Sequence, residues 1–128
     1  MVHVAYLCEY STVNGGENSL LAFLAGVQDR VRATILCPET GPLVDELRIR
    51  GIAHVPFEFH LSDGARKPAE LLIAELVQSV QNLNVDVVHA NSLSMCRLVG
   101  LSAGQLRCPT VGHIRDIMQV SAKGISDL

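Results

Sequence analysis

Five short apolar runs, separated by segments with helical spacing, constrain the fold of this chain more than any other feature. The runs are rich in valine, isoleucine and leucine and are nearly continuous rather than alternating, which is typical of parallel strands buried on both faces. They are Val2 to Cys8, Arg32 to Cys37, Ile52 to Phe57, Val85 to Ala90 and Thr110 to Ile114. The sequence therefore predicts five strands.

The segments between these runs carry apolar stripes with a helical period. The stripes are Leu20, Phe23, Leu24 and Val27; Leu43, Val44 and Leu47 before a stop at Gly51; Leu72, Ile73, Leu76 and Val80 after Pro68; and Leu98, Val99 and Leu106 after Ser92 as N-cap, in a helix from about Leu93 to Leu106. Strands that alternate with helices require right-handed crossovers. We therefore expect a Rossmann-like α/β fold, with a mostly parallel five-stranded sheet and helices on both faces.

Composition excludes several classes of protein. The chain has 128 residues, of which 48% are hydrophobic, and this size suits one compact domain. Its 10 basic and 13 acidic residues give a net charge of -3, without a basic block, so we expect no nucleic-acid partner. No window reaches the roughly 20 apolar residues of a membrane span, and no secretory leader is evident. The sequence favours a cytoplasmic protein without an integral membrane segment.

The four cysteines have neither the spacing of a zinc site nor that of a disulfide framework. They are Cys8, Cys37, Cys96 and Cys108. We expect all four to be reduced.

A glycine-containing stretch, residues 14–19, lies between the first apolar run and an amphipathic segment that begins at Leu20. Strand, glycine loop and helix in this order form an anion pocket, because the first amides of a helix lack intrahelical partners and glycine admits a phosphate close to the backbone. Gly15 and Gly16 therefore predict a phosphorylated ligand. The alternative is that they supply positive φ for a tight turn.

The same stretch disfavours the classical NAD and ATP sites. It lacks the three spaced glycines of a dinucleotide fingerprint and the Gly-Lys-Ser or Gly-Lys-Thr of a P-loop. Glu17 suits the first helical turn electrostatically but would repel a phosphate that came too close.

Polar residues follow the predicted strands at their carboxyl ends, where open parallel sheets bind ligands. They are Glu9, Tyr10, Ser11 and Thr12 after the first run, Glu39 and Thr40 after the second, Glu58 after the third, His89, Asn91 and Ser92 at the fourth, and His113, Arg115 and Asp116 at the fifth. We interpret this edge as the candidate site. Surface loops are polar in any protein, so an ordinary solvated edge is the alternative.

Alternation along the fourth run places His89 and Asn91 on one side, next to the hydroxyl of Ser92. One interpretation is a base or a set of groups that binds hydroxyls, and the other is a hydrogen-bonded structural histidine.

The same period of two pairs His113 with Arg115, whose guanidinium offers a forked donor for a phosphate or carboxylate. An ion pair between Arg115 and Asp116 is the alternative. Neither an H-x-x-x-H pattern nor a carboxylate cluster accompanies these residues, so we expect no metal.

Four segments, in order, resemble the N-terminal domain of retaining GT-B glycosyltransferases of family 4. They are Gly15-Gly16-Glu17 before a Leu-Leu helix, Cys37-Pro38-Glu39 with Gly41-Pro42-Leu43, the run from Asp86 to Ser92, and the run from Pro109 to Asp116. The resemblance implies two Rossmann-like domains that face a cleft. Residues 1–128 would then be one such domain on the acceptor side, truncated before the C-terminal donor domain.

The resemblance also implies an activity: transfer of a sugar from a nucleotide-sugar donor to an acceptor hydroxyl with retention of configuration, without metal or other cofactor. Gly15 and Gly16 would approach the donor diphosphate, and both are candidates because Glu17 follows them directly, without the family's usual intervening residue. The family's histidine position corresponds to Arg115, with His113 two residues earlier, so both are catalytic candidates. The isolated chain is expected to be inactive.

The acceptor implied by the resemblance is a sugar, a polysaccharide or a lipid-linked group, and we assign His89, Asn91 and Ser92 to binding it. A lipid-linked acceptor would place the protein peripherally at the inner face of the membrane.

Two other classes stay open. A non-catalytic receiver-like or ligand-binding module has the same α/β layer, although Glu58 stands where a receiver needs an aspartate. A GT-B sugar-nucleotide epimerase shares the fold but not the acceptor. The longest irregular stretch, Glu58 to Lys67, is either a loop near the ligand edge or an ordinary flexible connection.

Overall fold

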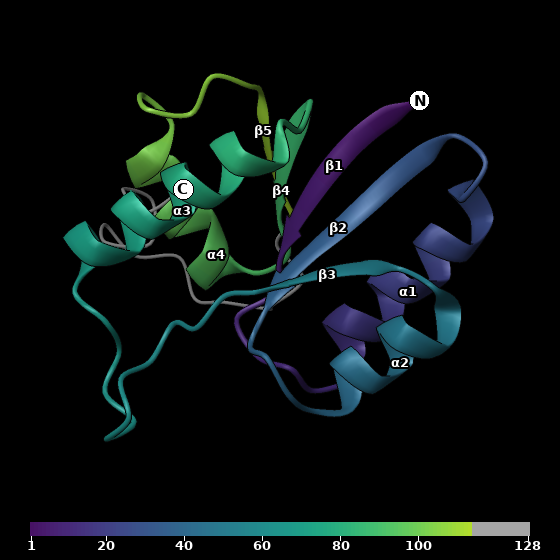
Figure 1. The fold of residues 1–128 in the computed structure, drawn as a ribbon, viewed down its shortest axis with the longest axis horizontal. Helices are drawn as coiled ribbons and strands as arrows, with labels where there is room; N and C mark the ends of the chain where they lie inside the picture. Colours follow the sequence, from purple (N-terminus) through teal and green to yellow (C-terminus); the bar gives the residue numbers. More distant parts are fainter. Residues whose placement is uncertain (114–128) are drawn as a thin grey trace, which may run out of the picture.

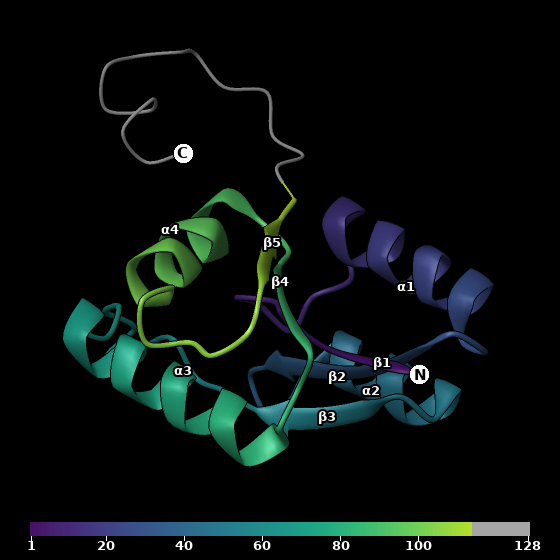
Figure 2. The ribbon, with the colours of Figure 1, turned by 90° about the horizontal axis from the view of Figure 1, so that it is seen from above.

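The computed structural model describes residues 1–113 and contains one five-stranded sheet in which every strand pair is parallel. The strands are β1 (Val2–Leu7), β2 (Val31–Cys37), β3 (Ala53–Pro56), β4 (Val87–Ala90) and β5 (Thr110–Gly112). Their order in the sheet is β3-β2-β1-β4-β5, and Figure 2 shows β4 beside β5. The predicted Rossmann-like sheet is therefore confirmed, and each predicted run overlaps one strand.

Four helices within residues 1–113 cover the two faces of this sheet. They are α1 (Gly15–Val27), α2 (Pro42–Arg50), α3 (Ala69–Leu83) and α4 (Leu93–Ser102). Figure 1 shows α1 and α2 on one side of the strands and α3 and α4 on the other. Strands are added outward from β1 in one direction and then, from β4, in the other, and right-handed crossovers in opposite directions place helices on opposite faces. The order reverses between β1 and β4, the point at which such sheets bind ligands.

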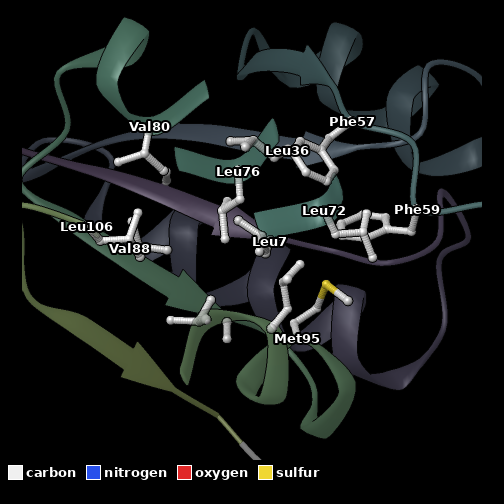
Figure 3. Packing of buried hydrophobic residues seen from close by; sticks show 14 residues of the cluster. Leu7, Leu36, Phe57, Phe59, Leu72, Leu76, Val80, Val88, Met95 and Leu106 are labelled. Carbon is white, nitrogen blue, oxygen red and sulfur yellow. The ribbon is translucent and has the colours of Figure 1, made fainter. Parts of the chain in front are cut away.

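Alternation along β1 divides the core into two apolar clusters. Ala5 and Leu7 face α3 and α4, whereas Val4 and Tyr6 face α1 and α2. Figure 3 shows the first cluster, in which side chains of β1, β4, α3 and α4 converge. Strands buried on both faces explain why the sequence shows continuous apolar runs rather than alternation.

The helix ends follow the predicted capping residues. Ser92 is the N-cap of α4 and its hydroxyl accepts a hydrogen bond from Met95 N at 3.3 Å. Gly51 ends α2 in the left-handed conformation, with φ of 68°. Helix α4 ends at Ser102, earlier than predicted, because the chain tightens there into i→i−3 turns: Ala103 N donates to Gly100 O at 3.4 Å, and Gln105 N donates to Ser102 O at 2.9 Å.

The first helix differs most from its prediction. It begins at Gly15, and its first i→i−4 hydrogen bond runs from Asn18 N to Asn14 O at 2.9 Å. Neither Gly15 nor Gly16 has positive φ, so the tight-turn alternative is wrong. The predicted stripe is also rotated: Phe23 is 53% exposed, and Leu21 is buried instead.

The segment between β3 and α3 is a hairpin, which Figure 1 shows extending from the sheet. Residues 58–67, called here the 58–67 hairpin, include an antiparallel bridge between His60 and Arg66, and Lys67 N donates to Phe59 O at 2.9 Å. Phe59 is fully buried under α3 and α4. The hairpin is therefore anchored in the core rather than joined as an ordinary flexible connection.

Candidate functional site

The glycine stretch and the end of β4 meet at the carboxyl edge of the sheet. Asn91 follows β4 directly, is buried, and its backbone N donates to Leu7 O at 3.1 Å. Its side-chain Nδ2 lies 3.4 Å from the carbonyl oxygen of Gly16 and 3.7 Å from Cys8 Sγ. The glycine stretch, which the sequence assigns to the donor diphosphate, and Asn91, which it assigns to the acceptor, are thus in direct contact where the strand order reverses.

The first turn of α1 presents backbone amides at this edge. Asn14, the N-cap, makes no side-chain capping bond, and its Nδ2 donates to Thr12 Oγ1 at 3.3 Å instead. The amides of residues 15–17 precede the first i→i−4 bond of the helix. A helix N-terminus carries partial positive charge, so this turn suits an anion.

Two features of the same turn bear on a close approach by a ligand. A Cβ at Gly15 would meet no atom within 4 Å, and φ at this position is not positive, so the fold itself does not require glycine here. The carboxylate of Glu17 accepts a hydrogen bond from Thr12 Oγ1 at 3.0 Å. Thr12 therefore fixes the one negative charge of the first turn.

Aromatic rings form a row across β1, β4 and β5. Tyr6 and His89 are register partners with ring centroids 4.9 Å apart, and the His89 and His113 centroids are 6.1 Å apart. His113 is exposed, and its backbone N donates to Ala90 O at 2.9 Å. His89 and His113 thus lie near one another, a contact that joins the ends of β4 and β5. The predicted Arg115, with Asp116, lies outside the described residues.

A pocket of about 240 Å³ opens beside this turn, between β1 and α4. It is lined by Cys8, Glu9, Tyr10, Glu17, Asn91, Ser92 and Ser94. Ser92 therefore both caps α4 and lines the pocket. Of the predicted acceptor residues, the structure brings Asn91 and Ser92 to this pocket, whereas His89 packs on Tyr6.

The 58–67 hairpin brings further polar groups to the pocket. Arg66 Nη1 donates to Glu9 Oε2 at 3.0 Å and to Ser94 Oγ at 2.9 Å. His60 Nε2 lies 3.7 Å from Glu9 Oε2, and its ring stacks on Tyr10 at 5.7 Å. The charge of Glu9, together with a hydrogen bond to it, raises the pKa of the Tyr10 phenol.

Sequence reasoning missed the roles of His60, Arg66 and Ser94. The signal that could have located this hairpin is the pair Asp63-Gly64, because Asp-Gly is a strong turn sequence. In the structure Asp63 Oδ1 accepts from Ala65 N at 2.9 Å, and Gly64 has φ of 89°.

A larger pocket, about 600 Å³, lies at the opposite edge of the sheet, beside the C-terminal ends of α1 and α2. Gln28 and Gly51, the C-caps of the two helices, line it. The negative ends of both helix dipoles point there, whereas Arg32 and Arg50 bring positive charge to its lining.

Two further properties of residues 1–113 concern metals and membranes. No group of three or more histidine, cysteine or acidic side chains in this range is arranged to hold a metal ion. No helix within the same range has the length and apolar character needed to cross a bilayer. The expected absence of a cofactor stays a prediction.

Comparisons with solved structures define the class of fold. The chain superposes on Anabaena Alr3699/HepE, solved in complex with UDP and glucose, with a TM-score of 0.74, 20% identity, and coverage of 98% of this chain and 34% of that one. For MurG of Acinetobacter baumannii the TM-score is 0.69 with 18% identity, covering 98% of this chain and 38% of that one. The chain therefore spans about a third of the length of these two proteins.

The same α/β fold also occurs in a universal stress protein. A universal stress protein of Arabidopsis thaliana, solved with AMP bound, matches with a TM-score of 0.54 and 12% identity over 97% of this chain and 98% of that one. No curated protein matches the sequence at a significant level. At these identities the structural matches show the fold alone.

The fold and its edge thus define a Rossmann-like domain of the kind found in GT-B glycosyltransferases. The family model for Glycosyltransferase Family 4 matches residues 13–124. The chain belongs to Glycosyltransferase Family 4, and the resemblance in the sequence is confirmed.

Proposed function

We propose that this chain is the acceptor-side N-terminal domain of a two-domain glycosyltransferase. In the complete enzyme it would transfer a sugar from a nucleotide-sugar donor to an acceptor hydroxyl with retention of configuration. The observation that carries the proposal is the first turn of α1, which has amides ahead of the first i→i−4 bond, no side-chain cap, and a glycine that the fold does not require.

The turn would act on the leaving diphosphate. Negative charge grows on this group as the bond to the sugar breaks, and fixed N–H donors stabilise such charge without reorganising. Gly15 and Gly16 would supply these donors and let the phosphate approach the backbone. Family membership and the UDP bound to Alr3699/HepE support a nucleoside diphosphate as the ligand.

The acceptor would lie on the β4 side of the same edge. Asn91 and Ser92 line the pocket beside α1, and His113 is exposed at the end of β5. We propose His113 and Arg115 as the catalytic candidates near the transferred sugar, with Asn91, Ser92 and His89 on the acceptor side. Catalysis would need no metal, because donors of the chain itself face the diphosphate.

Release of nucleoside diphosphate from a panel of nucleotide sugars, with methyl glycosides as acceptors, tests the proposal. We expect no release by the 128-residue chain alone, and release when a donor-binding domain follows it in one polypeptide. In that polypeptide Gly16→Val should lower kcat about 10²- to 10³-fold, because the added side chain would hold the diphosphate away from the charge-stabilising amides. Transfer by the chain alone, or wild-type kinetics in folded Gly16→Val, would contradict the proposal.

A further inference from the structure

We propose that Asn14 is a site of spontaneous deamidation, in which the backbone nitrogen of Gly15 displaces the side-chain amide and a carboxylate takes its place. Asn14 is the N-cap of α1, so the modification adds a negative charge at the first turn of this helix. The reaction is independent of the proposed function. Only its effect on ligand binding rests on that function, because we assign the same turn to the donor diphosphate.

Asn14 stands in the one Asn-Gly pair of the sequence. Glycine has no Cβ, so the Gly15 nitrogen can reach the side-chain carbonyl carbon of the preceding residue and close a five-membered ring without a steric clash. Every other asparagine precedes a residue with a side chain, which hinders the same attack. These asparagines are Asn18, Asn82, Asn84 and Asn91.

The backbone of Asn14 suits ring closure better than that of a residue inside a helix. Asn14 is exposed, with φ of −98° and ψ of −169°. At this ψ the Gly15 nitrogen lies closer to the Asn14 Cβ than it would at a helical ψ. Asn18 is also exposed but lies within α1, and its backbone N donates to Asn14 O at 2.9 Å. Ring closure at Asn18 would therefore require the helix to open.

The first turn of α1 also favours the reactive form of the nitrogen, which is the deprotonated amide. Gly15 precedes the first i→i−4 hydrogen bond, so its N–H has no acceptor within the helix. The positive end of the helix dipole stabilises negative charge at this position. Glu17 opposes that effect, but its carboxylate accepts from Thr12 Oγ1 at 3.0 Å. Asn14 Nδ2 donates to the same hydroxyl at 3.3 Å, so no capping bond holds the side chain away from Gly15.

The reaction consumes only water, with hydroxide as the base. Hydroxide removes the Gly15 N–H proton, the nitrogen attacks Asn14 Cγ, and the Cγ–Nδ2 bond breaks as Nδ2 takes a proton from water and leaves as ammonia. Water then opens the cyclic imide at either carbonyl carbon, and the ring nitrogen recovers a proton. One opening gives aspartate at position 14, and the other gives isoaspartate, in which the main chain runs through the side-chain carbon.

The new carboxylate would oppose a diphosphate at the same turn. Aspartate is as good an N-cap as asparagine, so α1 should keep its first residue. Its charge adds to that of Glu17, the acidic residue already in the first turn. Asn14→Asp carries the aspartate product and should therefore bind UDP about fivefold more weakly, as expected for two unit charges that repel across about 4 Å of water.

Mass spectrometry of the 128-residue chain, incubated at neutral and at alkaline pH, tests the reaction. We expect position 14 to lose ammonia and gain water, faster at alkaline pH, and to yield both aspartate and isoaspartate. Fragment spectra that separate Asn14 from Asn18 should show Asn18 intact. An unstructured peptide of residues 10–20 sets the time scale of the unprotected reaction.

Paired glycine variants test the route. Gly15→Ala should slow the conversion roughly tenfold, because the Cβ hinders attack by the nitrogen. The fold accommodates this change, since a Cβ at Gly15 meets no atom within 4 Å. Gly26→Ala, on the same helix and with the same free space, is the matched control and should leave the rate at Asn14 unchanged.

The outcomes distinguish this inference from the proposed function. Asn14 that stays intact in the folded chain while the peptide converts would overturn the inference, and so would an unchanged rate in Gly15→Ala or aspartate without isoaspartate. UDP titration of fresh and converted chain then reports on ligand binding. Conversion that leaves UDP affinity unchanged contradicts the diphosphate assignment alone, whereas UDP binding at residues 15–17 without any conversion contradicts the modification alone.

Discussion

Asn91 Nδ2 lies 3.4 Å from the carbonyl oxygen of Gly16, so the end of β4 contacts the first turn of α1 across the switch point of the sheet. Asn91 is also fixed by its backbone, which donates to Leu7 O at the end of β1. One buried amide therefore sets the distance between the helix that we assign to the diphosphate and the loop that we assign to the acceptor.

Replacing the Asn91 amide by a carboxylate should lower both the stability of the fold and the affinity for UDP. Asn91→Asp removes the donor to Gly16 O and places a negative charge beside the first turn of α1. We expect the free energy of unfolding to fall by about 1–3 kcal/mol, the usual cost of an unsatisfied buried partner, and UDP affinity to fall with it. Urea unfolding measures the first effect. Asn18→Asp, on the exposed face of α1, should change stability by less than about 0.5 kcal/mol; an equal loss in both variants would contradict the role of Asn91.

The packing of α4 on β5 depends on glycine at position 112. A Cβ there would lie 2.7 Å from Cys96 Sγ, so Gly112→Ala should lower stability by about 1–3 kcal/mol. Combining it with Cys96→Ala, which removes the sulfur, should recover most of that loss. Thermal unfolding of the single and double variants measures the coupling. Gly100→Ala, where a Cβ meets no atom within 4 Å, is the control and should stabilise α4 by about 0.5–1 kcal/mol. If the stability loss of the double variant equals the sum of the losses in the two single variants, the predicted clash between positions 96 and 112 is contradicted.

Acid should destabilise the fold through His3. Burial lowers the pKa of this imidazole, and Arg32 lowers it further while Asp86 raises it; Nε2 is 2.7 Å from Thr34 Oγ1. Below pH 6.5 the unfolded chain therefore binds more protons than the folded one, so the free energy of unfolding falls as the pH falls, by at most about 1.4 kcal/mol per pH unit for one proton.

Urea unfolding at a series of pH values between 8 and 5 measures this slope. His3→Gln keeps a polar side chain but does not titrate, so its slope over this interval should be smaller than that of the wild type. Identical slopes would show that His3 does not contribute. His54→Gln serves as a second histidine variant for comparison. His54 is half-buried, and its Nε2 lies 3.2 Å from a backbone oxygen, Cys37 O.

Much of the fold could be predicted because strand burial and helix periodicity are local properties of the sequence. Strands such as β1 are buried on both faces, so their apolar runs are continuous, and Ser92 and Gly51 mark helix ends through their own backbone chemistry. The stripe of α1 was predicted with Phe23 facing the sheet, because Leu20, Leu21, Phe23 and Leu24 are all apolar and their spacing does not decide which of them is buried. Packing on the sheet buries Leu21 and leaves Phe23 exposed.

The site was predicted less completely, because its contacts join residues far apart in the sequence. Polar residues at strand ends could be recognised, since parallel strands place their carboxyl ends at one edge. The approach of Arg66 to Glu9, 57 residues away, depends on the anchoring of the hairpin by Phe59, which no local pattern specifies. The role of Arg115 stays a prediction, because it lies outside the described residues.

The central claim, that the first turn of α1 receives a diphosphate, is tested most directly by titrating the 128-residue chain with UDP and following its backbone amides by NMR. Uridine, which lacks the diphosphate, is the ligand control, and Gly15→Val is the variant that fills the approach without a clash in the fold. We predict that UDP shifts the amides of residues 15–17 most, that uridine does not, and that Gly15→Val abolishes the shifts while keeping the folded spectrum. Equal shifts with uridine, or UDP binding that Gly15→Val leaves intact, would contradict the account.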